Sequence, residues 1–180
     1  MRAFIAIDLP EEVTAALVRL QSLLPAGRPV AEENLHLTLA FLGDQSEAVL
    51  AALHFELETI RVQPFALGFS GLGVFGGDRP RILFADVGTE PALADLHRRV
   101  TGALHRAGVA VQRARFHPHV TLARFGSRAT PGTAARLHRF LSDHGDTPLP
   151  SFPVTGFGLY ESTLHPSGAR YNLLARYPLG

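Results

Sequence analysis

Two histidines and two threonines recur at the same spacing in two copies of an eight-residue segment. The copies are His36-Leu37-Thr38-Leu39-Ala40-Phe41-Leu42-Gly43 and His119-Val120-Thr121-Leu122-Ala123-Arg124-Phe125-Gly126, and five of the eight positions are identical. In a strand, successive side chains alternate between faces, so the histidine and the threonine of each copy project to one side. If the two strands lie side by side, the two imidazoles and two hydroxyls together suit the chemistry of a phosphate ester. One imidazole would remove a proton, the other would supply one, and the hydroxyls would bind non-bridging oxygens.

A single His-x-Thr motif is a weak signal, because a half-buried histidine in a strand is more often a hydrogen-bonded structural residue than a catalyst. Because the motif occurs twice in matched surroundings, a functional site becomes the favoured interpretation. Both copies begin an apolar strand and end at a glycine. We therefore expect one shared site that contains His36, Thr38, His119 and Thr121.

The sixth position of the repeat differs in chemistry, with Phe41 in the first copy and Arg124 in the second. An asymmetric substrate in a pseudo-symmetric cleft would explain the difference, with the ring stacking on a base and the guanidinium binding phosphate. Strict alternation places both on the face opposite the histidines, unless the strand ends or bulges there. Core packing is therefore the favoured alternative for Phe41. For Arg124 we favour the phosphate contact, because burying an unpaired guanidinium is costly.

The elements expected around the motifs follow one order in both halves of the chain. The first half predicts a strand, a helix, the motif strand, a helix and a glycine-rich strand region, over residues 3–7, 10–24, 35–42, 46–60 and 65–75. The second half repeats them over residues 81–87, 91–107, 116–125, 131–144 and 152–160, and a further strand covers 170–177. The motif histidines are 83 positions apart and Gly71 and Gly156 are 85 apart, so one period aligns both.

This repeat predicts an α+β fold in a single domain over residues 1–180. We expect two pseudo-twofold-related lobes, over about residues 1–77 and 78–165, with the strand over 170–177 closing the domain. Mainly antiparallel sheets would line a central cleft, with the helices outside.

Composition excludes several kinds of chemistry. The 180 residues are 46% hydrophobic and include no cysteine, which excludes disulfides and thiolate catalysis. All 17 basic residues are arginine, so no lysine is present to carry AMP or form a Schiff base. The net charge of +1 does not by itself indicate nucleic-acid binding. No apolar stretch approaches the roughly 20 residues of a membrane span, so we expect a cytoplasmic protein without membrane contact. We also expect a monomer.

The segment Gly71-Leu72-Gly73-Val74-Phe75-Gly76 matches the dinucleotide-binding pattern G-x-G-x-x-G. That pattern binds a pyrophosphate only where it turns a strand into a helix. Here Pro80 and another expected strand follow. We predict that the glycines allow a close backbone approach or a bulge, and that no nicotinamide or flavin cofactor binds.

His117 and His119 are possible metal ligands on one strand face, but a catalytic metal site usually needs a third ligand. No aspartate or glutamate occurs at motif spacing near either copy. Five further histidines lie on expected helices beside charged residues: His54, His97, His105, His138 and His144. We therefore expect neither a metal nor another cofactor.

The paired motifs resemble the 2H phosphoesterase superfamily, which is defined by two His-x-Thr/Ser-x motifs in one domain. More closely, the chain resembles the bacterial and archaeal RNA 2′,3′-cyclic phosphodiesterases, also called 2′-5′ RNA ligases. The further matching segments are Arg2-Ala3-Phe4-Ile5-Ala6-Ile7, Glu33-Asn34-Leu35, Phe116-His117-Pro118, and Glu161-Ser162 through Gly168 and Tyr171. One departure is Pro29-Val30-Ala31-Glu32, where the family often has an aromatic residue.

The resemblance implies hydrolysis of 2′,3′-cyclic phosphates on RNA ends or nucleotides, mainly to the 2′-phosphomonoester. The residues support a metal-independent attack in which one histidine activates water, the other protonates the leaving ribose oxygen, and Thr38, Thr121 and Arg124 stabilise the developing charge. The near-symmetric motifs do not determine which histidine is the acid and which is the base; we take His119 as the base and His36 as the acid. ATP-independent 2′-5′ ligation by the reverse chemistry remains an alternative. A nucleotide- or RNA-binding module without turnover is another, although a binder has no need of two proton-transfer groups.

Overall fold

The structure is a computed structural model that describes residues 1–110, 115–126, 130–166 and 168–180. Parts of the expected second lobe, residues 111–114 and 127–129, lie outside the described residues. In chain order the described elements are β1 (Arg2–Asp8), α1 (Glu11–Gln21), β2 (Arg28–Pro29), the 3-10 helix η1 (Glu32–Asn34), β3 (His36–Asp44), α2 (Glu47–Glu58), β4 (Phe65–Leu67), β5 (Phe69–Phe75), β6 (Ile82–Val87), α3 (Pro91–Arg106), β7 (His119–Arg124), α4 (Pro131–His144), β8 (Phe152–Val154), β9 (Gly156–His165) and β10 (Gly168–Pro178).

The helices begin where the sequence provides start signals. Helix α1 follows Pro10 and carries Glu11 and Glu12 in its first turn, where negative charge is favourable. The Ser46 side chain accepts a hydrogen bond from the Val49 backbone N–H at the start of α2. Helix α4 begins with a reciprocal capping box between Thr130 and Thr133.

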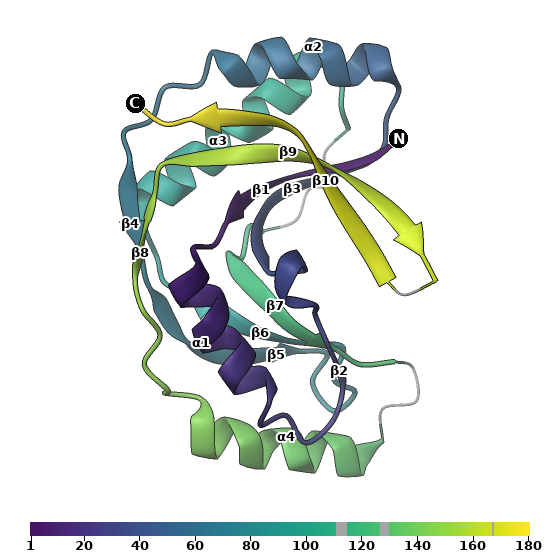
Figure 1. The fold of residues 1–180 in the computed structure, drawn as a ribbon, viewed down its shortest axis with the longest axis vertical. Helices are drawn as coiled ribbons and strands as arrows, with labels where there is room; N and C mark the ends of the chain where they lie inside the picture. The colour runs from purple at the N-terminus through teal and green to yellow at the C-terminus, as the bar shows by residue number, and fades with distance from the viewer. Residues whose placement is uncertain (111–114, 127–129, 167) are drawn as a thin grey trace.

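One long sheet dominates the fold, with strand order β10-β9-β1-β3-β7-β6-β5 and with β2 paired to β7 (Figure 1). All pairings between the described strands are antiparallel. We call β10, β9, β1 and β3 the β3 half-sheet, and β7, β6, β5 and β2 the β7 half-sheet. The predicted α+β class is therefore confirmed.

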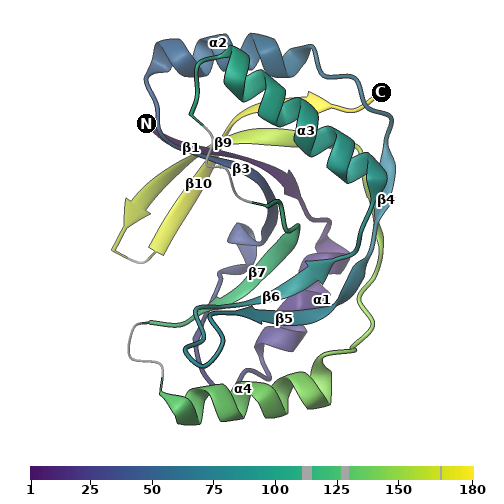
Figure 2. The same cartoon turned by 180° about the vertical axis from the view of Figure 1, so that it is seen from behind.

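The two halves of the sequence interleave in this sheet. Strand β9, from the second half, pairs with β1, and β5, from the first half, pairs with β6. The helices cross over likewise, because α3 packs on β3 and α1 packs on β7. Figure 2 shows α3 covering the β3 half-sheet from behind, and Figure 1 shows α1 in front of the β7 half-sheet. Each half-sheet therefore combines strands from both sequence repeats.

Two expected strands are each divided in two. Residues 65–75 form β4 and β5, and residues 152–160 belong to β8 and β9. Strands β4 and β8 pair with each other in a separate two-stranded sheet, while β5 and β9 join the long one. The breaks are single residues, Gly68 and Thr155, with strand-forming residues on both sides, so the sequence pattern predicted one continuous strand in each place.

Residues 71–75 lie within strand β5, and the chain continues into strand β6; as predicted, the segment does not open a helix. Gly73 permits a close approach, because a Cβ there would lie 2.6 Å from the ring of Phe84.

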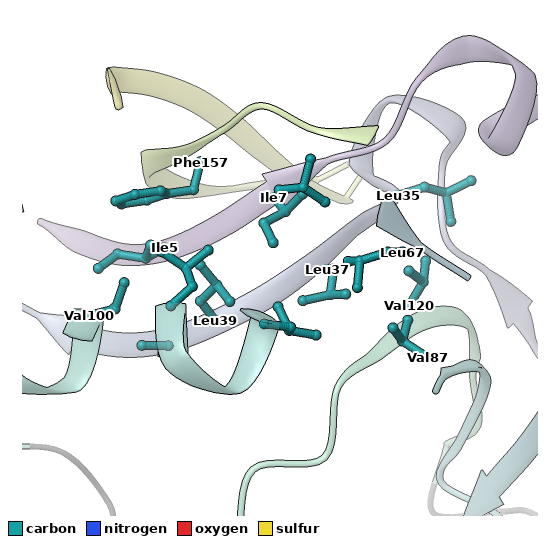
Figure 3. Packing of buried hydrophobic residues seen from close by; sticks show 14 of the residues in the cluster. Ile5, Ile7, Leu35, Leu37, Leu39, Leu67, Val87, Val100, Val120 and Phe157 are labelled. Carbon is teal, nitrogen blue, oxygen red and sulfur yellow. The ribbon is translucent and has the colours of Figure 1, made fainter. Parts of the chain in front are cut away.

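The half-sheets join where β3 meets β7, at the antiparallel pair Leu37–Val120. Both side chains are fully buried. Figure 3 shows them close to Leu67 and Val87. The side-chain amide of Gln21 on α1 strengthens this region by donating to the backbone carbonyls of Val30 and Leu122, each at 2.8 Å.

The variant Leu37→Ala should lower the free energy of unfolding by about 2–5 kcal/mol, because it leaves a cavity where the half-sheets meet. Urea denaturation measures the change. Leu164→Ala is the matched control, since Leu164 is 83% exposed and its loss should change stability by no more than about 0.5 kcal/mol. Equal effects of the two substitutions would contradict this role of Leu37.

Candidate active site

A cleft of about 1150 Å³ is lined by all four side chains of the predicted site: His36, Thr38, His119 and Thr121. The register of β3 and β7 explains why they meet. Leu37 lies opposite Val120 and both point into the core, so their neighbours along each strand point into the cleft. One step from this pair, His36 lies level with Thr121, and His119 lies level with Thr38.

Each motif histidine is held through Nδ1 by a backbone carbonyl two residues earlier. His36 Nδ1 lies 2.7 Å from the Asn34 oxygen, and His119 Nδ1 lies 2.7 Å from the His117 oxygen. A carbonyl oxygen only accepts, so Nδ1 must carry the hydrogen in both rings. Nε2 is then the atom that can take or give a proton in the cleft. In His36, Nε2 also lies 3.0 Å from the Thr38 hydroxyl oxygen.

Asn34 and His117, which supply these carbonyls, occupy equivalent positions of the 83-residue repeat but are anchored differently. The Asn34 side-chain amide donates to the Ala169 carbonyl of β10, at 2.8 Å. His117 Nε2 lies 2.8 Å from Asp86 Oδ1 of β6. The sequence offered these residues only as a part of the family resemblance and as a possible metal ligand. The repeat spacing itself was the signal that could have identified both as anchors.

Each motif histidine also faces an aspartate across the adjacent strand. Asp8 of β1 lies opposite His36, and Asp86 of β6 lies opposite His119. Asp8 accepts from the Tyr160 hydroxyl and pairs with an arginine of β10. Sequence reasoning missed both aspartates, because they are 78 positions apart and fall outside the 83-residue period.

Burial is the main cause that lowers the pKa of both His36 and His119 below the ordinary histidine value. The hydrogen bonds to the Asn34 and His117 carbonyls oppose this, and so does the negative charge of the facing aspartate. The positive charge of Arg124 lowers the pKa of both rings further. Without an anion in the cleft, both histidines therefore favour the neutral form near pH 7.

Aromatic rings flank both imidazoles. The ring centroid of His36 lies 5.0 Å from that of Phe4 and 5.3 Å from that of Tyr171. The ring of His119 lies 5.2 Å from those of Phe75 and Phe84, which stack on each other. These contacts hold the imidazole planes and account for part of the burial that lowers the pKa values.

Phe41 and Arg124 reach the cleft because both motif strands bulge at the same repeat position. Leu39 is the extra, unpaired residue in the pairing of β3 with β1, and Leu122 is the extra, unpaired residue in the pairing of β7 with β6. The bulge reverses the alternation, so the sixth position faces the same side as the histidine. Phe41 is 70% exposed and lines the cleft, so the favoured alternative of core packing is wrong. Arg124 is exposed and also lines the cleft.

The segment 29–32, where the family's aromatic residue is absent, lies along the same cleft. Leu164 and Tyr171 of the β9–β10 hairpin and Phe41 of β3 provide apolar surface there. The departure therefore leaves the cleft with aromatic surface from other elements.

Within the described ranges, no three His, Cys, Asp or Glu side chains gather in a way that could hold a metal ion. His117 pairs with Asp86, and His97 stacks on Phe116 with ring centroids 3.8 Å apart. In the same part of the chain, no helix is long and apolar enough to cross a membrane.

Comparisons with known proteins agree on one family. The model of the 2′-5′ RNA ligase superfamily matches residues 9–165. The RNA 2′,3′-cyclic phosphodiesterase of Aeropyrum pernix is 36% identical over 150 residues, which cover 82% of this chain and 83% of the relative. The protein of the same name from Escherichia coli is 34% identical over 182 residues, with coverage of 99% and 96%.

Solved structures give the same result for the fold. The crystal structure of Escherichia coli LigT complexed with 3′-AMP matches with a TM-score of 0.81 at 32% identity, and the match covers 99% of this chain and 97% of that one. A Thermus thermophilus protein matches with a TM-score of 0.78 at 30% identity and the same coverage.

Replacing each facing aspartate should change the pKa of one motif histidine and not that of the other. In the wild-type protein, both should titrate below the unperturbed pKa of about 6.5. Asp86→Asn removes a negative charge that raises the pKa of His119, so it should lower that pKa further and leave His36 unchanged. Asp8→Asn is the matched variant for His36. Imidazole resonances followed by NMR across the pH range measure these values, and equal shifts of both histidines in either variant would contradict the assignment.

Proposed function

The chain belongs to the 2′-5′ RNA ligase superfamily, and on that basis we propose that it hydrolyses RNA 2′,3′-cyclic phosphates to 2′-phosphomonoesters by metal-independent acid–base catalysis. The observation that carries the proposal is the matched anchoring of His36 and His119. Both rings donate Nδ1–H to a backbone carbonyl, which leaves two Nε2 atoms for proton transfer in one cleft. The name shared by the curated relatives supports hydrolysis as the activity.

In the proposed reaction, His119 Nε2 removes a proton from water as its oxygen attacks phosphorus. The bond from phosphorus to the ribose 3′ oxygen breaks, and His36 Nε2–H protonates that oxygen. The products are a free 3′-hydroxyl and a 2′-phosphomonoester. Each histidine ends with the proton state that the other had at the start, so proton exchange with solvent restores the enzyme.

The contact between His36 and Thr38 supports this assignment. When His36 is the protonated acid, Nε2–H donates to the Thr38 oxygen until the leaving ribose oxygen takes that proton, and the threonine hydroxyl hydrogen remains available for a phosphate oxygen. Thr121 would bind a second non-bridging oxygen, and Arg124 would stabilise the added charge. The anionic substrate would also raise the pKa of His36 and offset the burial that lowers it.

Phe41 is proposed to stack on the base of the terminal nucleotide, because its ring is exposed on the cleft side of β3. The cytoplasmic location and the monomeric state expected from the sequence are part of the same proposal. Ligation would follow the same steps with a 5′-hydroxyl in place of water as the nucleophile, and would give a 2′-5′ linkage and a free 3′-hydroxyl. The shared name of the relatives favours hydrolysis over ligation and over binding without turnover.

Replacement of either catalytic histidine should abolish most turnover. His36→Ala and His119→Ala should each lower kcat about 10²–10⁴-fold, since each removes one proton-transfer group. The assay measures the 2′-phosphomonoester released from an RNA with a 2′,3′-cyclic end, with a chelator present throughout. His138→Ala, on the exposed face of α4, is the control and should keep the wild-type rate.

Two results would contradict the mechanism. A loss of less than about tenfold in either histidine variant would remove that residue from proton transfer. Loss of wild-type activity in the chelator, restored by a divalent metal, would replace the two-histidine mechanism with a metal-bound water.

A further inference from the structure

The cleft continues beyond the two histidines to a pair of arginines. Arg28 of β2 lies directly opposite Arg124 of β7, and both line the cleft. Directly opposed residues of an antiparallel pair project to the same face. Two guanidinium groups on one face of the cleft suit a ligand that carries more than one phosphate.

The two guanidinium groups serve different parts of the cleft. The charge of Arg124 acts on both His36 and His119, so it lies close to the reacting centre. Arg28 extends toward the tip of the β9–β10 hairpin, because a Cβ added at Gly168 would lie 3.5 Å from its Nη2. Arg28 therefore spans the cleft from β2 to the hairpin.

The charges of the lining favour a polyanion. Arginines at four positions line the cleft, against two glutamates, Glu32 and Glu33; the arginines are Arg2, Arg28, Arg124 and Arg170. The whole chain has a formal net charge of only +1, so the positive charge is concentrated here. The volume of about 1150 Å³ also exceeds the range of about 300–1,000 Å³ for small-molecule pockets. A single terminal nucleotide would leave part of this space unfilled.

We propose that Arg28 binds the phosphate that joins the last two nucleotides of an RNA substrate, while the terminal cyclic phosphate lies between the histidines. This rests on the proposed function and adds a residue that selects an RNA end over a mononucleotide. A guanidinium presents two parallel N–H donors to a phosphate, which suits this recognition. Because the contact is made to the neighbouring phosphate and not to the reacting bonds, it acts on substrate binding and leaves the chemical step unchanged.

The test compares two substrates with the same cyclic end, adenosine 2′,3′-cyclic phosphate and the dinucleotide ApA ending in that group. Arg28→Gln should lower kcat/KM for the dinucleotide about tenfold to hundredfold, mainly through KM, and leave the mononucleotide within about twofold. With the wild-type enzyme, a dinucleotide with an uncharged methylphosphonate linkage should show the same loss of kcat/KM relative to the normal dinucleotide. Arg28→Gln should not lower kcat/KM for the methylphosphonate dinucleotide any further. Arg139→Gln, an exposed arginine of α4, controls for the loss of one charge.

Three results would overturn the proposal. The first is an equal loss of kcat/KM for both substrates in Arg28→Gln, and the second is no loss for either. The third is that Arg28→Gln lowers kcat/KM for the methylphosphonate dinucleotide as much as for the normal one. Thermal melting of each variant checks that it is folded. If the wild-type enzyme cleaves neither substrate, the proposed function fails separately. The affinities of wild type and Arg28→Gln for ApA with a 2′-phosphate and for adenosine 2′-phosphate then decide the inference without turnover. Equal losses of affinity for both ligands, or no loss for either, would also overturn it.

Discussion

The pairing of Leu37 with Val120 is the contact on which the site depends. These residues occupy equivalent positions of the two sequence repeats, and their pairing joins the two half-sheets. Because both side chains are fully buried, the adjacent histidines and threonines have only the cleft face available. A slip of one residue in either strand would exchange the two faces of that strand and turn its imidazole into the core. Hydrophobic burial at one point thus sets the positions of the motif histidines and threonines on the opposite face.

The bulges at Leu39 and Leu122 extend that arrangement along both strands. Each inserts one residue, keeps the following alanine buried, and returns the sixth position of the motif to the cleft. The symmetry of the backbone is therefore preserved while the chemistry at that position differs. One strand presents the exposed ring of Phe41 and the other presents the charge of Arg124. A pseudo-symmetric scaffold thereby presents two different chemical groups at equivalent positions, as the proposed binding of a base and a phosphate requires.

The interleaving of the two sequence halves makes the cleft a property of the whole chain. Strand β9 completes the half-sheet that carries His36, and strand β5 completes the half-sheet that carries His119. The β9–β10 hairpin reaches back to η1 through the bond from Asn34 to Ala169, and the Asn34 carbonyl in turn holds His36. The wall of the cleft and the orientation of the histidine are thereby linked through one residue. Beside β7, the His117 carbonyl holds His119 in the same way, and the side chain of His117 is anchored by Asp86.

The sequence alone determined the paired motifs, the α+β class and the order of the elements, because strand alternation, helix starts and an 83-residue repeat are local or periodic signals. It also brought the four motif side chains together, since Leu37 and Val120 had to be buried. Only the tertiary structure decided the exposure of Phe41, because a bulge depends on the register with a neighbouring strand. The same holds for Asp8, Asp86 and Arg28, whose places in the site follow from pairing between distant strands. Such pairings leave no mark in local sequence, because they are set by the packing of the whole sheet.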